Sequence, residues 1–412
     1  MTDQPLAGRT VIDLTTALAG PYATLLLAGL GATVIKVENP ATGGDTSRNN
    51  SPYVGKDGLA MSRRHDDDMS VSMLVRGRGK LSVTLNLKDP RAKSVFTDLV
   101  RDADVLVENY SPGVTGRLGI DYDSVREINP RLIYTSISGF GAQGGPGSGK
   151  AMDSIIQALS GVMMTAGEPD GDPVRFGLPI GDMLAPMFAV IGTVSALLQA
   201  ETTGQGQHVD VSMLGALTSL VACEPFDAFE AVGMPQRTGS MVPRLAPFGI
   251  LPVADGHIAL CAPTDAFAHG VLRAMGRADL VAEADFRTRD QRVRRADELH
   301  DLIRDWCRDL PKAEVIERLS AEGVPAAEVR DPKDAVRDPL VRRRREVVPI
   351  THPRHDTGAD LSATGLPITF SGASVGLDSP APALGEHNDH VYRDLLGYTD
   401  EELTALTADS VI

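Results

Sequence analysis

Two strand–helix–strand patterns follow one another in the first 140 residues, and they restrict the fold more than any other feature. In the first pattern, an apolar run at residues 10–14 precedes Gly20-Pro21 and a helical stretch at 22–30. A second apolar run follows at 33–37. Proline is tolerated at the first position of a helix, so Gly20-Pro21 is a suitable helix start. This order predicts one β-α-β unit.

The second pattern repeats this arrangement. Residues 81–87 have the character of a strand, Asp89-Pro90 begins a helix that reaches about residue 101, and strands are expected at 104–107 and 132–138. Apolar strands that alternate with helices are typical of a parallel sheet covered on both faces. We therefore predict an α/β fold with a Rossmann-like, doubly wound parallel sheet.

The chain is too long for one hydrophobic core, since cores stop growing at about 250–300 residues. Its 412 residues predict two domains or a dimer. A long apolar helix at 182–200 and a strand at 208–211 complete the first region, and a stretch rich in Pro, Gly and Met follows. We predict four segments: a large Rossmann-like domain at 1–221, a linker at 222–249, a small α+β domain at 250–330, and a return to the large domain at 331–412. A strand at 368–371 is expected to rejoin the first sheet.

The overall charge and the cysteines narrow the class of protein. A net charge of −15 argues against nucleic acid as a partner, because phosphate binding needs a basic face. Three widely spaced cysteines form neither a metal motif nor a disulfide framework. The first residues lack the pattern of a signal peptide, and no uninterrupted apolar run is expected to reach the length of a membrane span. We expect a soluble cytoplasmic protein with no membrane partner.

Two glycine-rich segments superficially match nucleotide-binding motifs. Gly29-Leu30-Gly31 follows a helix and precedes a strand, the reverse of the order that directs a helix N-terminus at a diphosphate. The segment 144–150 matches Gly-x4-Gly-Lys, but Ala151 stands where a P-loop needs Ser or Thr for magnesium. We interpret the first as the end of a helix and the second as a loop that leads to an active site.

Asp153 begins a helical stripe formed by Ile155, Leu159 and Val162. Aspartate is among the commonest residues at the N-cap of a helix, and this is the simplest interpretation of the spacing. The same position also favours an ionised carboxylate that acts as a nucleophile, because the helix dipole stabilises its charge. Spacing alone leaves both interpretations open.

Many short segments occur in an order that identifies a family resemblance. Two of them are Ala-Asp-Val-Leu-Val-Glu-Asn-Tyr-Ser-Pro-Gly at 103–113 and Thr-Gly-Gln-Gly-Gln-His-Val-Asp-Val-Ser-Met at 203–213. The others are residues 6–14, 20–21, 30–38, 43–45 with Arg48, 82–88, 117–119, 129–134, 138–141, Asp153 with 157–161, and 384–388. Over almost its whole length the chain resembles the family III CoA-transferases, the group that contains formyl-CoA transferase and carnitine CoA-transferase.

The resemblance implies that Asp153 is the nucleophile. Its carboxylate would attack an acyl-CoA thioester to form an aspartyl anhydride, the CoA thiolate would return to give an aspartyl-CoA thioester, and an acceptor acid would then collect CoA. Backbone N–H groups of glycine-rich segments are expected to stabilise each oxyanion. Coenzyme A is therefore implied as a substrate, carried by an acyl-CoA and transferred to a carboxylic acid.

The same resemblance implies a binding site for CoA. Lys88 and Arg117 suit its phosphates, which an acidic protein must meet with local cations. The implied site consists of Leu18, Ala19, Asn39, Leu85, Asn86, Leu87, Lys88, Asn109, Tyr110, Ser111, Arg117, Ile137, Ser138, Gly139 and Phe140.

Two other activities remain open beside the transferase. The related α-methylacyl-CoA racemases place a His before the Asp and use a second Asp in a Gly-Asp pair; Asp182 matches the second, but Met152 replaces the His and cannot titrate. Met152 therefore favours the transferase. A non-catalytic acyl-CoA-binding relative is the third possibility, and the residues do not identify the acids.

The remaining expectations concern metals and assembly. His352 and His355 have a metal-like spacing, but the sequence offers no helix and no third ligand beside them, so we expect no metal. The family resemblance implies a homodimer in which each chain forms a ring interlocked with the other.

Overall fold

The computed structural model describes residues 4–146, 149–354 and 360–412. The chain divides into two compact units. The larger unit comprises Met1–Ser160, Gly177–Cys223 and Val336–Ile412, and the smaller unit comprises Gly161–Phe176 and Glu224–Ala335.

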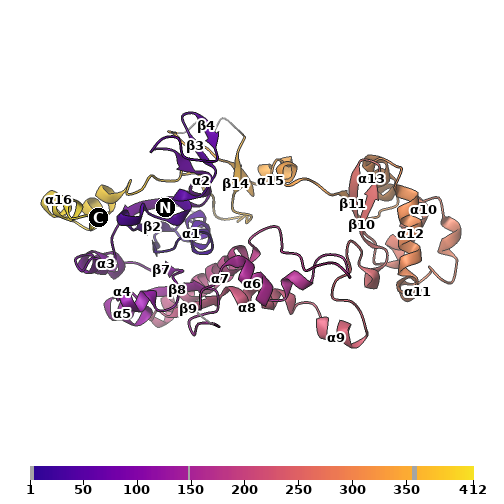
Figure 1. Ribbon diagram of the computed structural model, residues 1–412, viewed down its shortest axis with the longest axis horizontal. Helices are drawn as coiled ribbons and strands as arrows, with labels where there is room; N and C mark the ends of the chain where they lie inside the picture. The colour runs from indigo at the N-terminus through magenta and orange to yellow at the C-terminus, as the bar shows by residue number, and fades with distance from the viewer. Residues whose placement is uncertain (1–3, 147–148, 355–359) are drawn as a thin grey trace. The chain divides into compact units, whose positions relative to one another are not determined.

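A six-stranded sheet forms the centre of the larger unit (Figure 1). Its strands lie in the order β6-β2-β1-β7-β8-β9, and every neighbouring pair is parallel. Numbered along the chain, this is the 3-2-1-4-5-6 order of doubly wound folds. The predicted α/β class with a parallel sheet is confirmed. The strands are β1 (Thr10–Asp13), β2 (Thr33–Glu38), β6 (Lys80–Thr84), β7 (Val105–Glu108), β8 (Ile133–Ser138) and β9 (His208–Ser212).

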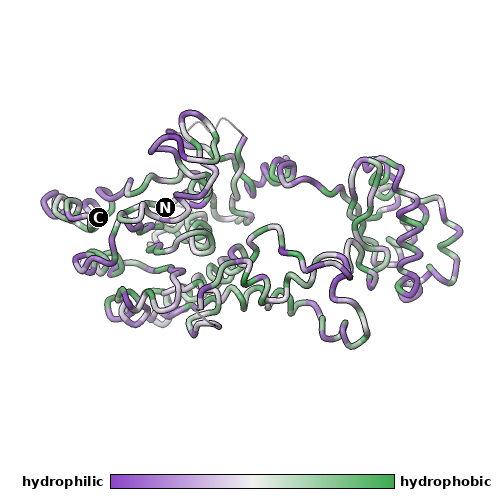
Figure 2. Tube along the Cα trace, in the orientation of Figure 1, coloured by the Kyte–Doolittle hydropathy of each residue, from purple (hydrophilic) through white to green (hydrophobic). Residues whose placement is uncertain are grey.

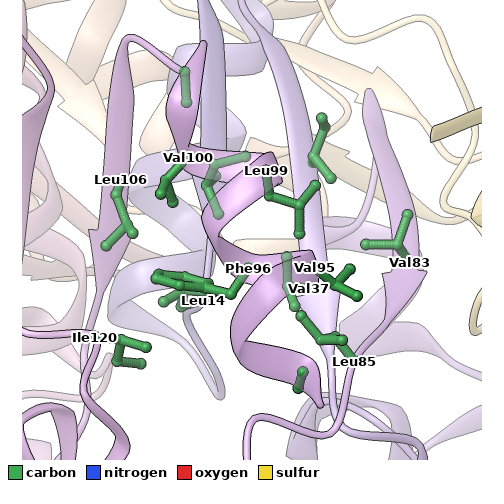
Figure 3. Close-up of a cluster of buried hydrophobic side chains, with 14 of the residues drawn as sticks. Leu14, Val37, Val83, Leu85, Val95, Phe96, Leu99, Val100, Leu106 and Ile120 are labelled. Atoms are coloured by element: carbon green, nitrogen blue, oxygen red, sulfur yellow. The ribbon is translucent and has the colours of Figure 1, made fainter. Parts of the chain in front are cut away.

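Helices cover both faces of this sheet because its side chains alternate between the faces. On one face, Val95, Phe96 and Leu99 of α3 (Ala92–Arg101) pack against side chains of the strands (Figure 3). On the other face lie α1 (Ala19–Gly29) and α7 (Ile180–Thr203), which contact each other and the strands. The other helices of this part of the chain are α4 (Val114–Leu118), α5 (Tyr122–Ile128), α6 (Asp153–Leu159) and α8 (Met213–Val221).

The helix α7 is long and apolar enough, by length and composition, to span a membrane. The expectation that no run reaches this length is therefore wrong. In Figure 2, α7 is green over most of its length. Core helices of soluble proteins meet the same criterion, and several small residues of α7 are buried against the larger unit, among them Ala185, Ala189 and Ala196.

The segment 336–412 returns to the larger unit without adding a strand to the six-stranded sheet. The predicted strand at 368–371 is wrong: these residues have no strand conformation, and Ile368 and Phe370 are partly exposed. The edge of β6 is occupied instead by His387, whose N–H donates to the Ser82 carbonyl, and by Asn388, whose Oδ1 accepts from the Thr84 N–H. The last elements are α15 (Pro339–Arg343), the antiparallel pair β13 (Val347–Pro349) and β14 (Ser362–Thr364), the π-helix η6 (Asp389–Leu395) and α16 (Asp400–Ala408).

A small antiparallel sheet forms within the segment 51–73. Its order is β4-β3-β5, and α2 follows it directly. Buried Val54 and Met69 of this sheet pack with Met73 and Leu74 of α2 into a small core. The elements are β3 (Tyr53–Gly55), β4 (Gly58–Ala60), β5 (Met69–Ser70) and α2 (Val71–Arg76).

The smaller unit has its own core. An antiparallel sheet in the order β10-β11-β12 is covered by amphipathic helices, of which α12 alternates between purple and green in Figure 2. Leu299 and Ile303 of α12 are almost fully buried against the sheet residues Ile258 and Leu260. Its elements are α9 (Phe226–Ala231), β10 (Phe248–Val253), β11 (Gly256–Cys261), α10 (Asp265–Ala274), α11 (Arg289–Arg294), α12 (Ala296–Cys307), α13 (Lys312–Ala321), β12 (Ala326–Glu328) and α14 (Pro332–Ala335).

Candidate active site

Asp153 is the first helical residue of α6 and not its N-cap. Met152 occupies the N-cap position with an extended backbone and makes no side-chain capping bond. The simplest interpretation of the sequence, in which Asp153 caps its own helix, is therefore wrong. The carboxylate is buried, with 8% of the residue exposed, and it turns to another part of the chain.

The Asp153 carboxylate caps the N-terminus of α7. Its Oδ1 accepts hydrogen bonds from the backbone N–H groups of Gly181 at 2.8 Å and Asp182 at 3.3 Å. Its Oδ2 accepts from the Gln157 Nε2 at 2.7 Å, and Gln157 is fully buried one turn along α6. These three donors are neutral, so they stabilise the ionised carboxylate without pairing it to a cation.

Gly181 allows this close approach. A Cβ atom at position 181 would lie 3.1 Å from Oδ1 of Asp153 and 3.5 Å from the Ile156 side chain. Contacts of 3.1 Å are tighter than a Cβ normally makes, so a larger residue would displace the carboxylate or the start of α7. The glycine therefore sets the distance between α6 and the N-terminus of α7.

Asp182 is a second carboxylate beside Asp153. Burial, and then the charge of Asp153, raise the pKa of Asp182 to about 6, although Arg76 acts in the opposite direction. Arg76 is the last residue of α2. Burial lowers its pKa, although the charges of Asp45 and Asp182 act in the opposite direction. The Nε of Arg76 is buried and has no hydrogen-bond partner in the described part of the chain. An incompletely paired guanidinium thus lies near the carboxylates of Asp182 and Asp45.

A cavity of about 330 Å³ opens at the carboxyl ends of β1, β2, β6 and β7. Ligands of open α/β sheets bind at this edge, where the strand order reverses, here between β1 and β7. Five of the predicted CoA-binding residues line the cavity: Asn39, Leu85, Leu87, Lys88 and Tyr110.

Asn109 shapes the loop that borders this cavity. Its Oδ1 accepts from the Thr16 N–H at 2.8 Å, and its Nδ2 donates to the Thr16 carbonyl at 2.9 Å. This reciprocal pair ties the loop after β1 to the end of β7. Gly20 is required nearby, because a Cβ there would come within 2.3 Å of the Thr15 side chain.

A second cavity of about 270 Å³ lies at the carboxyl end of β7, along β8, and beside His208 at the start of β9. Tyr110, Ser111 and Ser138 line it, so Tyr110 borders both cavities. The walls also carry the acidic residues Glu108 and Asp123. Acidic residues line the first cavity too, but its wall includes Lys88, whereas the described lining of the second cavity contains no Lys or Arg, so the second is less suited to a phosphate.

The other predicted residues do not line either cavity. Ala19 begins α1, directly after Leu18. Ile137 is buried within β8, and Arg117 is exposed at the end of α4. The remaining members of this group are Asn86, Asn109, Gly139 and Phe140.

Gly139 connects the end of β8 with the approach to Asp153. A Cβ at 139 would lie 2.4 Å from that of Ala151, two residues before the carboxylate. The Gly139 carbonyl accepts from the Leu214 N–H at 3.0 Å, which fixes the same loop to α8. The structure thereby brings the end of the implied CoA site close to the nucleophile candidate.

Six ionisable side chains form a buried ionic layer that reaches the wall of the first cavity through Glu38 and Asp45: Asp13, Lys36, Glu38, Asp45, Arg48 and Lys80. Each is at most 8% exposed, and the three anions balance the three cations. Lys80 Nζ lies 3.0 Å from Asp13 Oδ2, and Lys36 Nζ lies 2.7 Å from Asp45 Oδ2. Arg48 makes a two-pronged contact with Glu38, at 2.7 Å and 2.6 Å.

The buried ionic layer supports the loop after β1. Lys36 Nζ donates to the Thr15 carbonyl at 2.8 Å, and Asp45 Oδ1 accepts from the Ala17 N–H at 2.9 Å. Burial alone would raise the pKa of Asp13, but Lys36 and Lys80 outweigh burial and hold it below its usual value. Burial lowers the pKa of Lys80 to about 8. The layer therefore holds in place the loop after β1, which forms part of the cavity wall.

The described residues contain no group of three or more His, Cys, Asp or Glu able to hold a metal ion. His352 contacts the Ala381 carbonyl through its Nε2 at 3.1 Å. His355 lies outside the described residues.

The sequence analysis missed the cavity residues Thr15, Thr16, Asp45 and Thr46. Thr15 and Thr16 directly follow the first strand, and ligands of such sheets bind outside the carboxyl ends of the strands. That position was a usable signal. Asp45 and Thr46 come close only through the path of the loop after β2, for which the sequence offers no spacing rule.

Comparison of the sequence with models of protein families identifies the family. Residues 6–388 match the model described as CoA-transferase family III. The chain belongs to this family. It is an enzyme of the CoA-transferase type, and CoA is its substrate.

Curated relatives of this CoA-transferase span its whole length. It is 35% identical to the formyl-CoA:oxalate CoA-transferase of Streptomyces coelicolor, over 100% of both chains. It is 34% identical to the succinyl-CoA–L-malate CoA-transferase beta subunit of Chloroflexus aurantiacus, over 100% of this chain and 99% of the relative. Among solved structures, the CAIB/BAIF family protein from Brucella suis superimposes with a TM-score of 0.81 at 30% identity, covering 96% of this chain and 100% of the other.

Proposed function

We propose that this CoA-transferase works through covalent catalysis by Asp153. A carboxylate attacks the thioester carbonyl of the donor, the C–S bond breaks, and an aspartyl anhydride and the CoA thiolate form. The thiolate then attacks the aspartyl carbonyl and expels the donor acid, which leaves an aspartyl-CoA thioester. The acceptor carboxylate reverses both steps. The observation that carries this proposal is the buried Asp153 carboxylate held by three neutral donors.

The donor set supports nucleophilic attack by Asp153. An ionised carboxylate has about four lone-pair sites, and the three hydrogen bonds of Asp153 leave one of them on Oδ2. A guanidinium in direct contact would withdraw charge from both oxygens and weaken the nucleophile. We further propose that CoA occupies the cavity lined by Leu85, Lys88 and Tyr110, with the Lys88 ammonium at its phosphates.

We propose an acceptor with two carboxylate groups. The named relatives act on oxalate and L-malate, each of which carries a second carboxylate. Arg76 is the cation suited to hold such a group, because its Nε is buried without a partner near Asp182. A bidentate guanidinium–carboxylate contact would then orient the reacting end of the acid.

Trapping of the covalent intermediate tests the mechanism. The protein is mixed with hydroxylamine and with members of an acyl-CoA panel that includes oxalyl-CoA and succinyl-CoA, and its peptides are examined by mass spectrometry. A hydroxamate at Asp153 is the expected result. Turnover of a donor and acceptor pair without any modification at Asp153 would contradict the covalent mechanism.

A second activity is favoured by one observation, the pKa of Asp182, which burial and Asp153 raise to about 6. A carboxyl group that titrates near neutrality suits general acid–base catalysis, as α-proton exchange of a racemase requires. Met152, exposed and unable to titrate, lies where the racemases place a His. Deuterium incorporation at the α-carbon of an acyl-CoA in D2O, with no acceptor acid present, would support the racemase instead.

We also propose a homodimer, interlocked as the family resemblance implies. Large apolar side chains are exposed on α6 and α7, including Ile155, Leu159, Ile191 and Leu198, each at least half exposed. The helices α6 and α7 contact each other, and several exposed large apolar side chains on neighbouring helices are typical of a protein interface. A monomer in analytical ultracentrifugation at micromolar concentration would contradict this proposal.

We propose that the enzyme works in the cytoplasm, with α7 in contact with protein and not with lipid. The buried small residues of α7 and the buried Thr193 at its centre support this placement. Fractionation of cells that express the full chain, with recovery in the soluble fraction, is the expected result.

A further inference from the structure

The two oxygens of the Asp153 carboxylate have different environments. Oδ1 accepts two backbone N–H groups, from Gly181 at 2.8 Å and Asp182 at 3.3 Å. Oδ2 accepts only the Gln157 side chain, at 2.7 Å. An ionised carboxylate oxygen has about two lone-pair sites, so those of Oδ1 are used and one of Oδ2 is available.

We infer that Oδ1 stays on Asp153 through every turnover as the oxyanion oxygen, while Oδ2 attacks the donor and is exchanged. The inference rests on the proposed function, in which Asp153 is the nucleophile. It assigns the N–H groups of Gly181 and Asp182 as the oxyanion hole for the aspartyl carbonyl. The assignment does not include the oxyanion hole for the carbonyl group of the substrate.

The steps balance with this assignment. Oδ2 forms a bond to the donor carbonyl carbon, and CoA leaves as its thiolate. The thiolate adds to Cγ, and the electron pair of the Cγ=Oδ1 bond moves to Oδ1. When that pair returns, the Cγ–Oδ2 bond breaks, so the donor acid leaves with the former Oδ2 of Asp153. An oxygen of the acceptor acid takes its place in the reverse steps.

The position of Oδ1 suits a developing negative charge. Gly181 N lies within the 2.7–3.1 Å range expected for an oxyanion donor. The two N–H groups belong to the first turn of α7, a helix of 24 residues, whose N-terminus carries positive partial charge. These donors are already in place before the reaction, so the chain does not have to reorganise when the charge appears.

The two oxygens also differ in how they can move. Exchanging them requires rotation of the side chain, which breaks all three hydrogen bonds at once. Gly181 also lies close to this end of the side chain, since a Cβ at position 181 would be only 3.1 Å from Oδ1. The carboxylate therefore keeps its orientation between turnovers.

Oxygen labelling tests the inference. A donor that produces the Asp153 hydroxamate, for example succinyl-CoA, is allowed to exchange for many turnovers with its own acid labelled with oxygen-18 in every carboxylate position. The mass of the peptide that contains Asp153 is then measured by mass spectrometry. We expect one oxygen-18 atom in Asp153, and no increase as turnover continues.

The possible outcomes separate the two levels of the proposal. Two oxygen-18 atoms in Asp153 would show that Oδ1 is exchanged as well, which overturns the inference and leaves the nucleophile intact. No oxygen-18 in Asp153 during turnover, together with no hydroxamate, would overturn the proposed function itself.

A glycine substitution provides an independent test. Gly181→Ala places a methyl group 3.1 Å from Oδ1, in a helical position that alanine tolerates. We expect kcat to fall about 10- to 100-fold, which is less than the roughly 10²–10³ that complete loss of an oxyanion donor costs, because alanine keeps its N–H and only displaces Oδ1. We also expect a second oxygen-18 atom to enter Asp153. Gly215→Ala, in α8, is the matched control, because its methyl group would make only an ordinary 3.5 Å contact with Ser212. An unchanged kcat and a single label in Gly181→Ala would contradict the assigned oxyanion hole.

Discussion

The larger unit buries carboxylates in two regions that differ in their partners. In the buried ionic layer, Asp13 lies 3.0 Å from the Lys80 ammonium and is completely excluded from solvent. At the corner between α6 and α7, Asp153 is almost as buried but receives its hydrogen bonds from two backbone N–H groups and an amide. A cation neutralises the first carboxylate, whereas the second one accepts its three hydrogen bonds from neutral donors.

On the proposed mechanism, this difference separates a structural from a chemical use of the same side chain. A carboxylate paired with a cation in a dry interior is costly to disturb, because removing one partner leaves an uncompensated charge. A carboxylate held by neutral donors can lose its charge during a reaction without leaving a cation unpaired. Substitutions in the two regions should therefore affect different properties.

The largest effect is expected from Asp153→Asn. The amide oxygen can still accept from the N–H groups of Gly181 and Asp182, so the free energy of unfolding should change by less than about 1 kcal/mol. The nucleophile is lost, and kcat should fall by about 10⁴-fold or more. Steady-state rates and urea unfolding measure the two quantities. Activity within tenfold of the unsubstituted enzyme would remove Asp153 from the mechanism.

For Asp13→Asn, a large loss of stability is expected. Lys80 would lose its counter-charge in a dry interior, and the free energy of unfolding should fall by about 3–5 kcal/mol. Asp102→Asn, at an exposed position after α3, is the control and should change it by less than about 0.5 kcal/mol. Urea unfolding followed by circular dichroism gives both values. Equal stability of the two variants would mean that the buried ionic layer is not the structural element described above.

A smaller effect on activity is expected from Gln157→Leu. The leucine keeps the bulk of the buried side chain but cannot donate to Oδ2 of Asp153. We expect kcat to fall about 10- to 100-fold, since the carboxylate loses the group that orients it, while KM for the acyl-CoA changes little. A change confined to KM would assign Gln157 to substrate binding instead.

The smallest effect concerns the stability of Asp182→Asn as a function of pH. The pKa of Asp182 is raised to about 6 in the folded protein from 3.8, so the folded state binds this proton more tightly than the unfolded state does. Ionisation of Asp182 therefore lowers stability as pH rises from about 4 through 6. At pH 7.5 the variant should be more stable by roughly 1–2 kcal/mol, with allowance for partial exposure, and the two proteins should match near pH 4. Parallel urea titrations at both pH values measure the difference; a constant offset between them would exclude the titration of Asp182 as its cause.

Local patterns predicted the parallel sheet but not the partners of its charges. The strands at residues 10–14 and 33–37 were recognisable because each has an apolar run beside a helical stretch. The ionic pairs join residues of different strands and loops, such as Asp13 with Lys80, and no spacing rule connects them. The strand predicted at 368–371 failed because side chains of the segment 387–388 satisfy the β6 edge.

Asp153 itself illustrates the limit of local reasoning about a site. Spacing indicated an N-cap, and the family resemblance indicated a nucleophile, but neither identified the N-terminus of α7 as its partner. Gly181 and Asp182 follow it by 28 and 29 residues, across a segment that belongs to the smaller unit. Only the three-dimensional path of the chain brings them together.

The discontinuous path of the chain also orders its synthesis. The smaller unit is closed by residue 335, so a ribosome can release all of its core residues while the larger unit still lacks the segment 336–412. That segment supplies Val391 and Tyr392 to the core beneath the six-stranded sheet, and the Tyr392 hydroxyl donates to the Thr84 carbonyl at 2.7 Å. During translation the edge of β6 therefore stays unpaired until residues 387 and 388 have been made. Nascent chains stalled before residue 386 should bind chaperones.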